Sequence, residues 1–258
     1  MRYWYVFLGI MWHNLLTFKR YVFNTLSSLV TLYLVFVLLF FGARSVGGPG
    51  FALSGTQDGL IIGYFIWSLA IFTFSELSWG LTNEAQQGTL EQLYLSPVGF
   101  RFVAAARSVS NLMLTLVANF LILLLAMATA GRWLSVDLVS LIPILLLTII
   151  GVIGLSFAIG GLALIHKRIQ AFLQLMQFVL VGFIAIPWAQ FPWARYLPLA
   201  MGNHLSRQVM AEGLRLWQLN PGDLLVLGAT AVGYLVLGVF AFGWAERVAR
   251  DRGLLGQY

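Results

Sequence analysis

Long uninterrupted runs of apolar residues dominate the chain, and short polar stretches separate them. Six of these runs reach or approach the ~20 residues that an α-helix needs to cross the hydrocarbon of a bilayer. Turn residues such as the cluster Gly47-Gly48-Pro49-Gly50 lie in the connections. The pattern predicts an all-α membrane protein, a single domain over residues 1–258 with six transmembrane helices at about 22–41, 59–82, 107–130, 139–165, 171–190 and 223–244.

A different pattern precedes the first run. Residues 1–20 are mostly aromatic and aliphatic, and Arg2, His13 and Arg20 fall on one side of a helix at about 100° per residue. A narrow polar stripe on an apolar helix is typical of a helix that lies in the plane of the membrane surface. We therefore expect an interfacial amphipathic N-terminal helix at about 1–20. The alternative, an extension of the first span, would bury Lys19 and Arg20 in hydrocarbon at a high cost.

Composition agrees with a membrane location. The chain is 60% hydrophobic and only 9% charged, with a mean hydropathy of +0.88. Soluble domains contain about 45–50% apolar and about 25% charged residues. A chain of this size cannot hide so much apolar surface in its interior, so the surface must meet lipid. Because there is no cysteine, disulfides, thiolate metal sites and cysteine nucleophiles are excluded.

The basic residues predict the orientation, because lysine and arginine concentrate on the cytoplasmic side of membrane proteins. If both termini are cytoplasmic, ten basic residues lie inside and five outside. The net charge of +6 is spread over the ends of the apolar runs, which fits anionic lipid headgroups better than nucleic acid. The inside set is Arg2, Lys19, Arg20, Arg101, Arg107, Lys167, Arg168, Arg247, Arg250 and Arg252; the outside set is Arg44, Arg132, Arg195, Arg207 and Arg215.

The polar loop 82–102 between the second and third runs is the most informative segment. Thr89 can cap a short helix whose apolar residues Leu90, Leu93 and Tyr94 share one face, and Pro97 ends that helix. Two helical turns with one apolar face and neighbouring carboxylates suit a cleft on a cytoplasmic partner. An ordinary amphipathic loop on the membrane surface is an equally good interpretation of the residues alone.

The motif Glu84-x-x-x-Gly88-Thr89-Leu90-Glu91-x-Leu93-x-x-x-Pro97 resembles the signature of ABC-type-2 permeases, the membrane subunits of ATP-binding-cassette exporters. The layout of the whole chain is similar as well, from the N-terminal helix to the basic tail. Many members carry a basic residue directly after the first glutamate, whereas Ala85 and Gln86 follow here. The resemblance implies that residues 88–97 form a short cytoplasmic coupling helix that docks on a nucleotide-binding subunit.

The same resemblance implies the function and the partners. The chain lacks a G-x-x-x-x-G-K-[ST] phosphate loop, so ATP and magnesium are expected on a separate ATPase chain, and no cofactor and no metal on this one. We expect a permease subunit, not an enzyme, in the cell membrane, paired with a second copy of itself or a close paralogue. A drug, a lipid or a glycoconjugate would be the substrate. An intramembrane enzyme and a secondary carrier are the alternatives.

Polar residues inside the runs form three helical stripes, which must face protein or water because lipid cannot satisfy them. Glu76 is an acid within the second run and is a functional candidate for that reason. We predict that Ser75, Glu76, Gln170, Gln174 and Gln177 line a pathway near a dimer axis, with packing between helices as the alternative. The stripes are Tyr64, Ser68, Ser75, Trp79 and Thr82; Ser108, Asn111, Thr115 and Asn119; and Gln170, Gln174 and Gln177.

Small residues in the fourth run predict close helix packing. Gly151, Gly154, Ala158 and Gly161 share one side, whereas the glycines of the sixth run recur every five residues and share none. The segment 187–221, which follows the fifth run, contains a stretch at 202–216 that is compatible with a helix. The family resemblance implies short helices that dip back into the outer leaflet there, and composition equally permits a helix on the surface.

Overall fold

The computed structural model describes residues 22–47, 56–86, 100–165, 169–186 and 190–251, together with scattered positions within 6–20. Within these ranges the chain is all-helical, with seven α-helices, two short 3-10 helices and no strand. The long helices are α2 (Val22–Gly47), α4 (Thr56–Gln86), α6 (Phe100–Ala130), α7 (Leu138–Ile165), α8 (Gln170–Ala185) and α10 (Pro221–Asp251); between α8 and α10 lie η1 (Pro192–Tyr196), α9 (Ala200–Met210) and η2 (Leu216–Gln218).

Each of the six predicted runs forms a long helix. Four helices are long and apolar enough to cross a membrane, over Thr25–Gly47, Thr56–Ser75, Leu138–Leu162 and Pro221–Ala249. The apolar stretches Thr115–Ala130 and Ala171–Ala185 are shorter. A run of apolar side chains becomes helical in lipid because only a helix pairs every backbone N–H and C=O within the segment. The chain is therefore a helical membrane protein, as its composition predicts.

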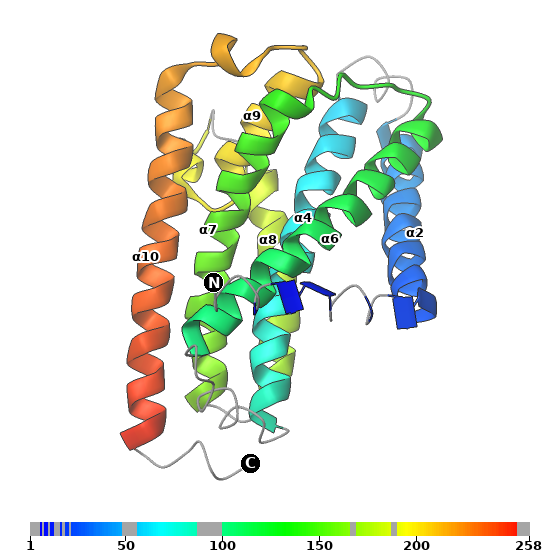
Figure 1. Cartoon of the computed structure of the whole chain (residues 1–258). Helices are drawn as coiled ribbons and strands as arrows, with labels where there is room; N and C mark the ends of the chain where they lie inside the picture. Colours follow the sequence, from blue (N-terminus) through cyan, green and yellow to red (C-terminus); the bar gives the residue numbers. More distant parts are fainter. Residues whose placement is uncertain are drawn as a thin grey trace.

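The helices form a bundle with α4 at its centre (Figure 1). Helix α4 contacts α2, α6, α7, α8 and α9, and the most extensive helix contact joins α7 to α10. Successive long helices run in opposite directions. One end of the bundle, drawn at the top of Figure 1 and called the upper end here, therefore carries the loops 131–137 and 211–220. The lower end carries the last turn of α4 and the last residue of α10.

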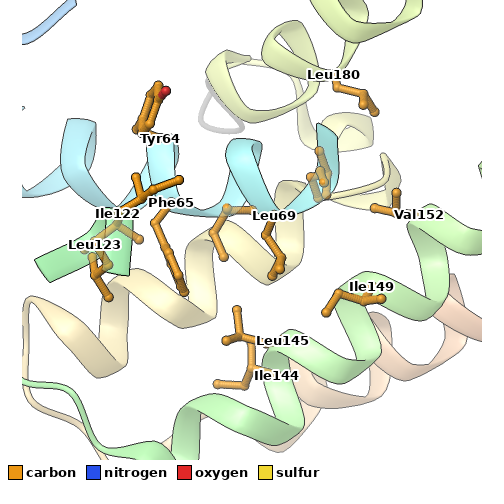
Figure 2. Close-up of a cluster of buried hydrophobic side chains, with 14 of the residues drawn as sticks. Tyr64, Phe65, Leu69, Ile122, Leu123, Ile144, Leu145, Ile149, Val152 and Leu180 are labelled. Atoms are coloured by element: carbon orange, nitrogen blue, oxygen red, sulfur yellow. The ribbon is translucent and has the colours of Figure 1, made fainter. Parts of the chain in front are cut away.

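The core lies where α4, α6 and α7 meet. Phe65 and Leu69 of α4 lie among Ile122 and Leu123 of α6 and Ile144 and Leu145 of α7 (Figure 2), and all six are at most 1% exposed. In contrast, only 11% of the α2 span and 17% of the α10 span are buried. These two helices present most of their apolar side chains to their surroundings, as segments in contact with lipid do.

Glycine permits the close contact between α7 and α10. A Cβ atom on Gly154 would overlap the backbone of Tyr234, and one on Gly238 would overlap the backbone of Gly154. A Cβ on Gly161 would lie only 3.2 Å from Cα of Phe242. Lipid provides no hydrophobic drive for helix association, so close packing through small residues is a principal source of attraction. The predicted packing role of the small-residue side of the fourth run is confirmed.

The loops at the upper end are tied to the helix ends. Asp137 caps α7, since its carboxylate accepts hydrogen bonds from the backbone N–H of Val139 at 3.2 Å and from the Ser140 hydroxyl at 2.6 Å. The Ser140 hydroxyl in turn accepts a bond from the backbone N–H of Leu216 at 2.8 Å. The loop that precedes α10 is thus fixed to the first turn of α7.

Two predicted elements fall largely outside the described residues. The described positions within 6–20 are helical, and the placement of that helix in the plane of a membrane stays a prediction. The predicted coupling helix at 88–97 lies wholly outside the described residues. So do Gly88, Thr89, Leu90, Glu91, Leu93 and Pro97, whereas Glu84 belongs to α4 with its side chain not described.

Candidate functional site

Polar side chains lie along one side of α4. At successive positions along the helix they form hydrogen bonds with three different neighbouring helices, α2, α6 and α8. The Tyr64 hydroxyl donates to the backbone oxygen of Leu32 in α2 at 2.5 Å. The Ser68 hydroxyl donates to the side-chain oxygen of Asn119 in α6 at 2.5 Å. Residues 64, 68 and 75 fall within about 40° of each other on a helix, which explains why they share this side. We call Tyr64, Ser68, Ser75, Asn119 and Gln177 the polar column.

The lower end of the polar column joins α4 to α8. The side-chain amide of Gln177 donates to the Ser75 hydroxyl at 3.0 Å, and the Trp67 indole donates to the backbone oxygen of Gln177 at 3.3 Å. Ser68 and Asn119 are completely buried one level above. The prediction that the polar stripes face protein or water is confirmed for these residues, because each bonds to a neighbouring helix.

The predicted pathway residues are brought together in part. Ser75 and Gln177 are in contact, and Gln174 lies exposed one turn of α8 below Gln177. Glu76 belongs to α4 and Gln170 begins α8, but their side chains lie outside the described part of the structure. The hydrogen bond between Ser75 and Gln177 joins two helices, as expected if these residues serve in packing between helices. The exposed Gln174 amide, in contrast, needs water or a partner surface, because lipid cannot satisfy it.

The segment between α8 and α10 packs within the bundle and does not lie flat on its end. A Cβ atom on Gly202, near the start of α9, would overlap the side chain of Thr148, which lies about 15 Å along α7 from Leu138. At its other end α9 returns to the upper end, where the Ser135 hydroxyl donates to the backbone oxygen of Val209 at 2.7 Å. Residues 190–199, called the inserted turn here, therefore precede a helix that rises from inside the bundle (Figure 1).

The inserted turn is held in a strained shape. Leu199, directly before α9, has a φ of +73°, a conformation that costs a side-chain-bearing residue about 1–2 kcal/mol. Leu199 is 4% exposed, so its surroundings hold the strain in place. A cavity of about 10 Å³ lies between the turn, α7 and α10, with Leu147, Leu197 and Tyr234 in its lining. This space is the size of one water molecule, so a larger ligand would need an open surface.

An ion pair at the upper end of the bundle joins Arg132, in the loop that follows α6, to Asp58, in the first turn of α4. Two nitrogens of the Arg132 guanidinium donate to the two oxygens of Asp58, at 3.3 and 3.1 Å. The hydrogen bonds and the charge of Asp58 raise the pKa of Arg132 above its ordinary value. Arg132 is 52% exposed, and a pair this open to solvent stabilises the fold little. Its role is to fix the loop 131–137 over the start of α4.

Sequence reasoning missed two features of this region. Trp67 contributes the indole that bonds to Gln177, although its position gave no polar signal. The 3-10 helix η1, which contains Arg195, lies ahead of the stretch at 202–216 that the sequence marks as helix-compatible, and its tight turn was not predicted. The prolines at 192 and 198, which bracket five residues, were the available signal of a tight turn.

We expect a cysteine that replaces Gln174 to react with a water-soluble thiol reagent in the purified protein. The reason is that thiols react as thiolates, which form in water and not in lipid. Leu175→Cys is the matched control, because Leu175 is also exposed, at 57%, but it is an apolar residue on the adjacent side of α8. Labelling is followed by mass shift of the intact chain. If neither cysteine reacts with the reagent, the glutamine side chains of α8 serve only in packing between helices.

Within the described residues no three His, Cys, Asp or Glu side chains are grouped so that they could hold a metal ion. Comparison of the chain with protein-family models, with curated proteins and with solved structures finds no match. The features of the chain that bear on its function are therefore the motif, the arrangement of the helices and the placement of polar side chains.

Proposed function

We propose that the chain is the transmembrane permease subunit of an ATP-binding-cassette exporter, with six membrane crossings and both termini in the cytoplasm. A separate ATPase subunit would bind ATP and magnesium and drive export of a hydrophobic or amphipathic substrate. A second copy of the chain, or a close paralogue, would complete the pathway. The observation that carries the proposal is the motif from Glu84 to Pro97, which resembles the ABC-type-2 signature.

The arrangement of the helices supports this proposal. The first residue of the motif, Glu84, lies in the last turn of α4, and this turn is at the lower end of the bundle (Figure 1). That is the end where a coupling helix could meet a partner outside the membrane. Lys19, Arg20 and Arg247 lie near helix ends of the lower half, and Arg44, Arg132 and Arg215 near those of the upper half. The sequence assigns ten basic residues to the side of Lys19, Arg20 and Arg247 and five to the side of Arg44, Arg132 and Arg215, which favours a cytoplasmic position for the lower end.

An intramembrane enzyme and a secondary carrier have less support. Ser156 is completely buried, and its hydroxyl donates to the backbone oxygen of Val152 at 2.8 Å, so it is poorly placed as a nucleophile. A carrier usually places ionisable groups at broken helices near the membrane centre. The described polar column consists of neutral hydroxyl and amide groups. Co-purification of an ATPase subunit with the chain from its native membrane would separate the exporter from both alternatives.

The orientation can be checked with single cysteines, because the natural chain has none. Ser45→Cys and Glu212→Cys, at exposed positions of the upper end, are expected to react with an impermeant maleimide in intact cells. Asp251→Cys, at an exposed position of the lower end, is expected to react only after the cells are permeabilised. The reverse labelling pattern would show that the upper end is cytoplasmic. The motif would then lie on the outer side of the membrane, where a cytoplasmic ATPase could not bind it.

A further inference from the structure

Arg195 lies at a depth where an exposed cation is unusual. The Tyr234 hydroxyl donates to the backbone oxygen of Tyr196 at 3.1 Å, which ties η1 to the middle of α10. Tyr234 lies about 20 Å along α10 from Pro221, by the rise of 1.5 Å per residue. Arg195 is adjacent in the chain, and its side chain is exposed.

The exposed apolar side chains of α10 indicate where hydrocarbon meets the bundle. They extend from Leu225 to Trp244, which is about 29 Å along the helix and equals the thickness of a bilayer core. Tyr234 lies near the centre of this band. The inserted turn, which bonds to Tyr234, therefore places Arg195 within the apolar zone and away from its upper edge.

The charge of Arg195 is not neutralised by any described carboxylate. Its guanidinium lies 4.7 Å from the centre of the Tyr196 ring and donates one hydrogen bond to the Tyr196 hydroxyl. These contacts hold the guanidinium in place, and most of its five N–H donors have no hydrogen-bond partner among the described residues. A charged group exposed to lipid at this depth is costly, so charged residues in membrane segments normally face water or a binding partner.

The surroundings of Arg195 are suited to an amphipathic ligand. Phe191, Trp193 and Tyr196 are 45%, 57% and 47% exposed, so the guanidinium lies among open aromatic surfaces. A guanidinium binds phosphate and carboxylate groups through paired N–H donors, and aromatic rings pack against acyl chains. We propose that Arg195, with Trp193 and Tyr196, forms the binding subsite for the anionic headgroup of an amphipathic substrate. This assignment rests on the proposed transport function and narrows the substrate to anionic amphiphiles.

Binding by the purified full chain in neutral detergent would test the assignment. Native mass spectrometry would measure the affinity for three probes: phosphatidic acid, phosphatidylcholine with the same acyl chains, and inorganic phosphate. We expect phosphatidic acid to bind the wild-type chain at least about tenfold more tightly than either other probe, because a hydrogen-bonded charge pair in a water-poor site is strong. Arg195→Gln is expected to remove this preference, and Arg195→Lys to keep only part of it.

The control variant is Arg215→Gln. Arg215 also packs its guanidinium over an aromatic ring, at 5.4 Å from the centre of Trp217, but it lies in the loop at the upper end. The Arg215→Gln variant should therefore keep the wild-type preference. If Arg195→Gln keeps the preference, or if both variants lose it equally, Arg195 is not the headgroup site. Equally tight binding of inorganic phosphate would show a site for small anions and overturn the amphiphile assignment.

These measurements use no ATPase, which separates the two proposals. If the preference depends on Arg195 but no ATPase subunit co-purifies with the chain from its native membrane, the exporter is contradicted and the anion site is supported. If an ATPase subunit co-purifies but the preference for phosphatidic acid does not depend on Arg195, the exporter is supported and the anion site is contradicted.

Discussion

Replacement of Leu93 by aspartate is expected to abolish capture of the ATPase subunit while the chain still folds and inserts. The helical spacing places Leu93 on one face with Leu90 and Tyr94, the face proposed to enter the cleft of the partner. Burial of an unpaired charge costs several kcal/mol. Since each 1.4 kcal/mol is a factor of ten, the affinity for the ATPase should fall by at least about a hundredfold.

The matched control for this variant is Gln92→Asp. Gln92 lies about 150° away from the centre of the apolar face on a helix, so it carries the same new charge on the polar side. Capture of the ATPase from native membranes by detergent-solubilised variants, together with ATP turnover of the captured complex, provides the measurement. Undiminished capture by Leu93→Asp, or equal loss in both variants, would contradict docking through this face.

Replacement of Gly154 or Gly238 by alanine is expected to destabilise the bundle severely. The added methyl group would meet backbone atoms of the facing helix, and backbone cannot move aside as a flexible side chain can. Overpacking of a core by side chains already costs about 1–3 kcal/mol, so a conflict with backbone should cost more. The long contact between α7 and α10 would have to open along much of its length.

Gly233→Ala is the control within the same helix. A Cβ atom at Gly233 has no neighbour within 4 Å, so this alanine should leave the packing intact and slightly favour the helix, by about 0.5–1 kcal/mol. Thermal unfolding in detergent, followed by the fluorescence of the native tryptophans, compares the three variants. A melting temperature of Gly238→Ala close to that of Gly233→Ala would show that α7 and α10 do not pack as described.

The location of the helices was predictable from sequence because the bilayer imposes the same requirement on every crossing. The run predicted at 139–165 is helix Leu138–Ile165, and the run at 107–130 ends with helix α6 at Ala130. Differences concentrate at helix ends: α10 continues to Asp251, beyond the predicted 244, and α8 stops at Ala185, before 190. Polar residues extend α10 past the apolar zone, and the approach to Pro187 stops α8, since the residue before a proline disfavours the helix.

The sequence by itself determined that the chain is a helical membrane protein, which side of the fourth run packs closely, and which polar stripes cannot face lipid. Each of these follows from local composition and helical periodicity, which operate within one segment. Only the tertiary structure decided that Gln177 bonds to Ser75, that Gly154 meets Gly238 and that Arg195 lies at the level of Tyr234. These contacts join residues far apart in the chain, and their geometry depends on how the helices cross and how deeply the inserted turn penetrates. Periodicity within one helix carries no information about the crossing of helices or about the depth of the inserted turn.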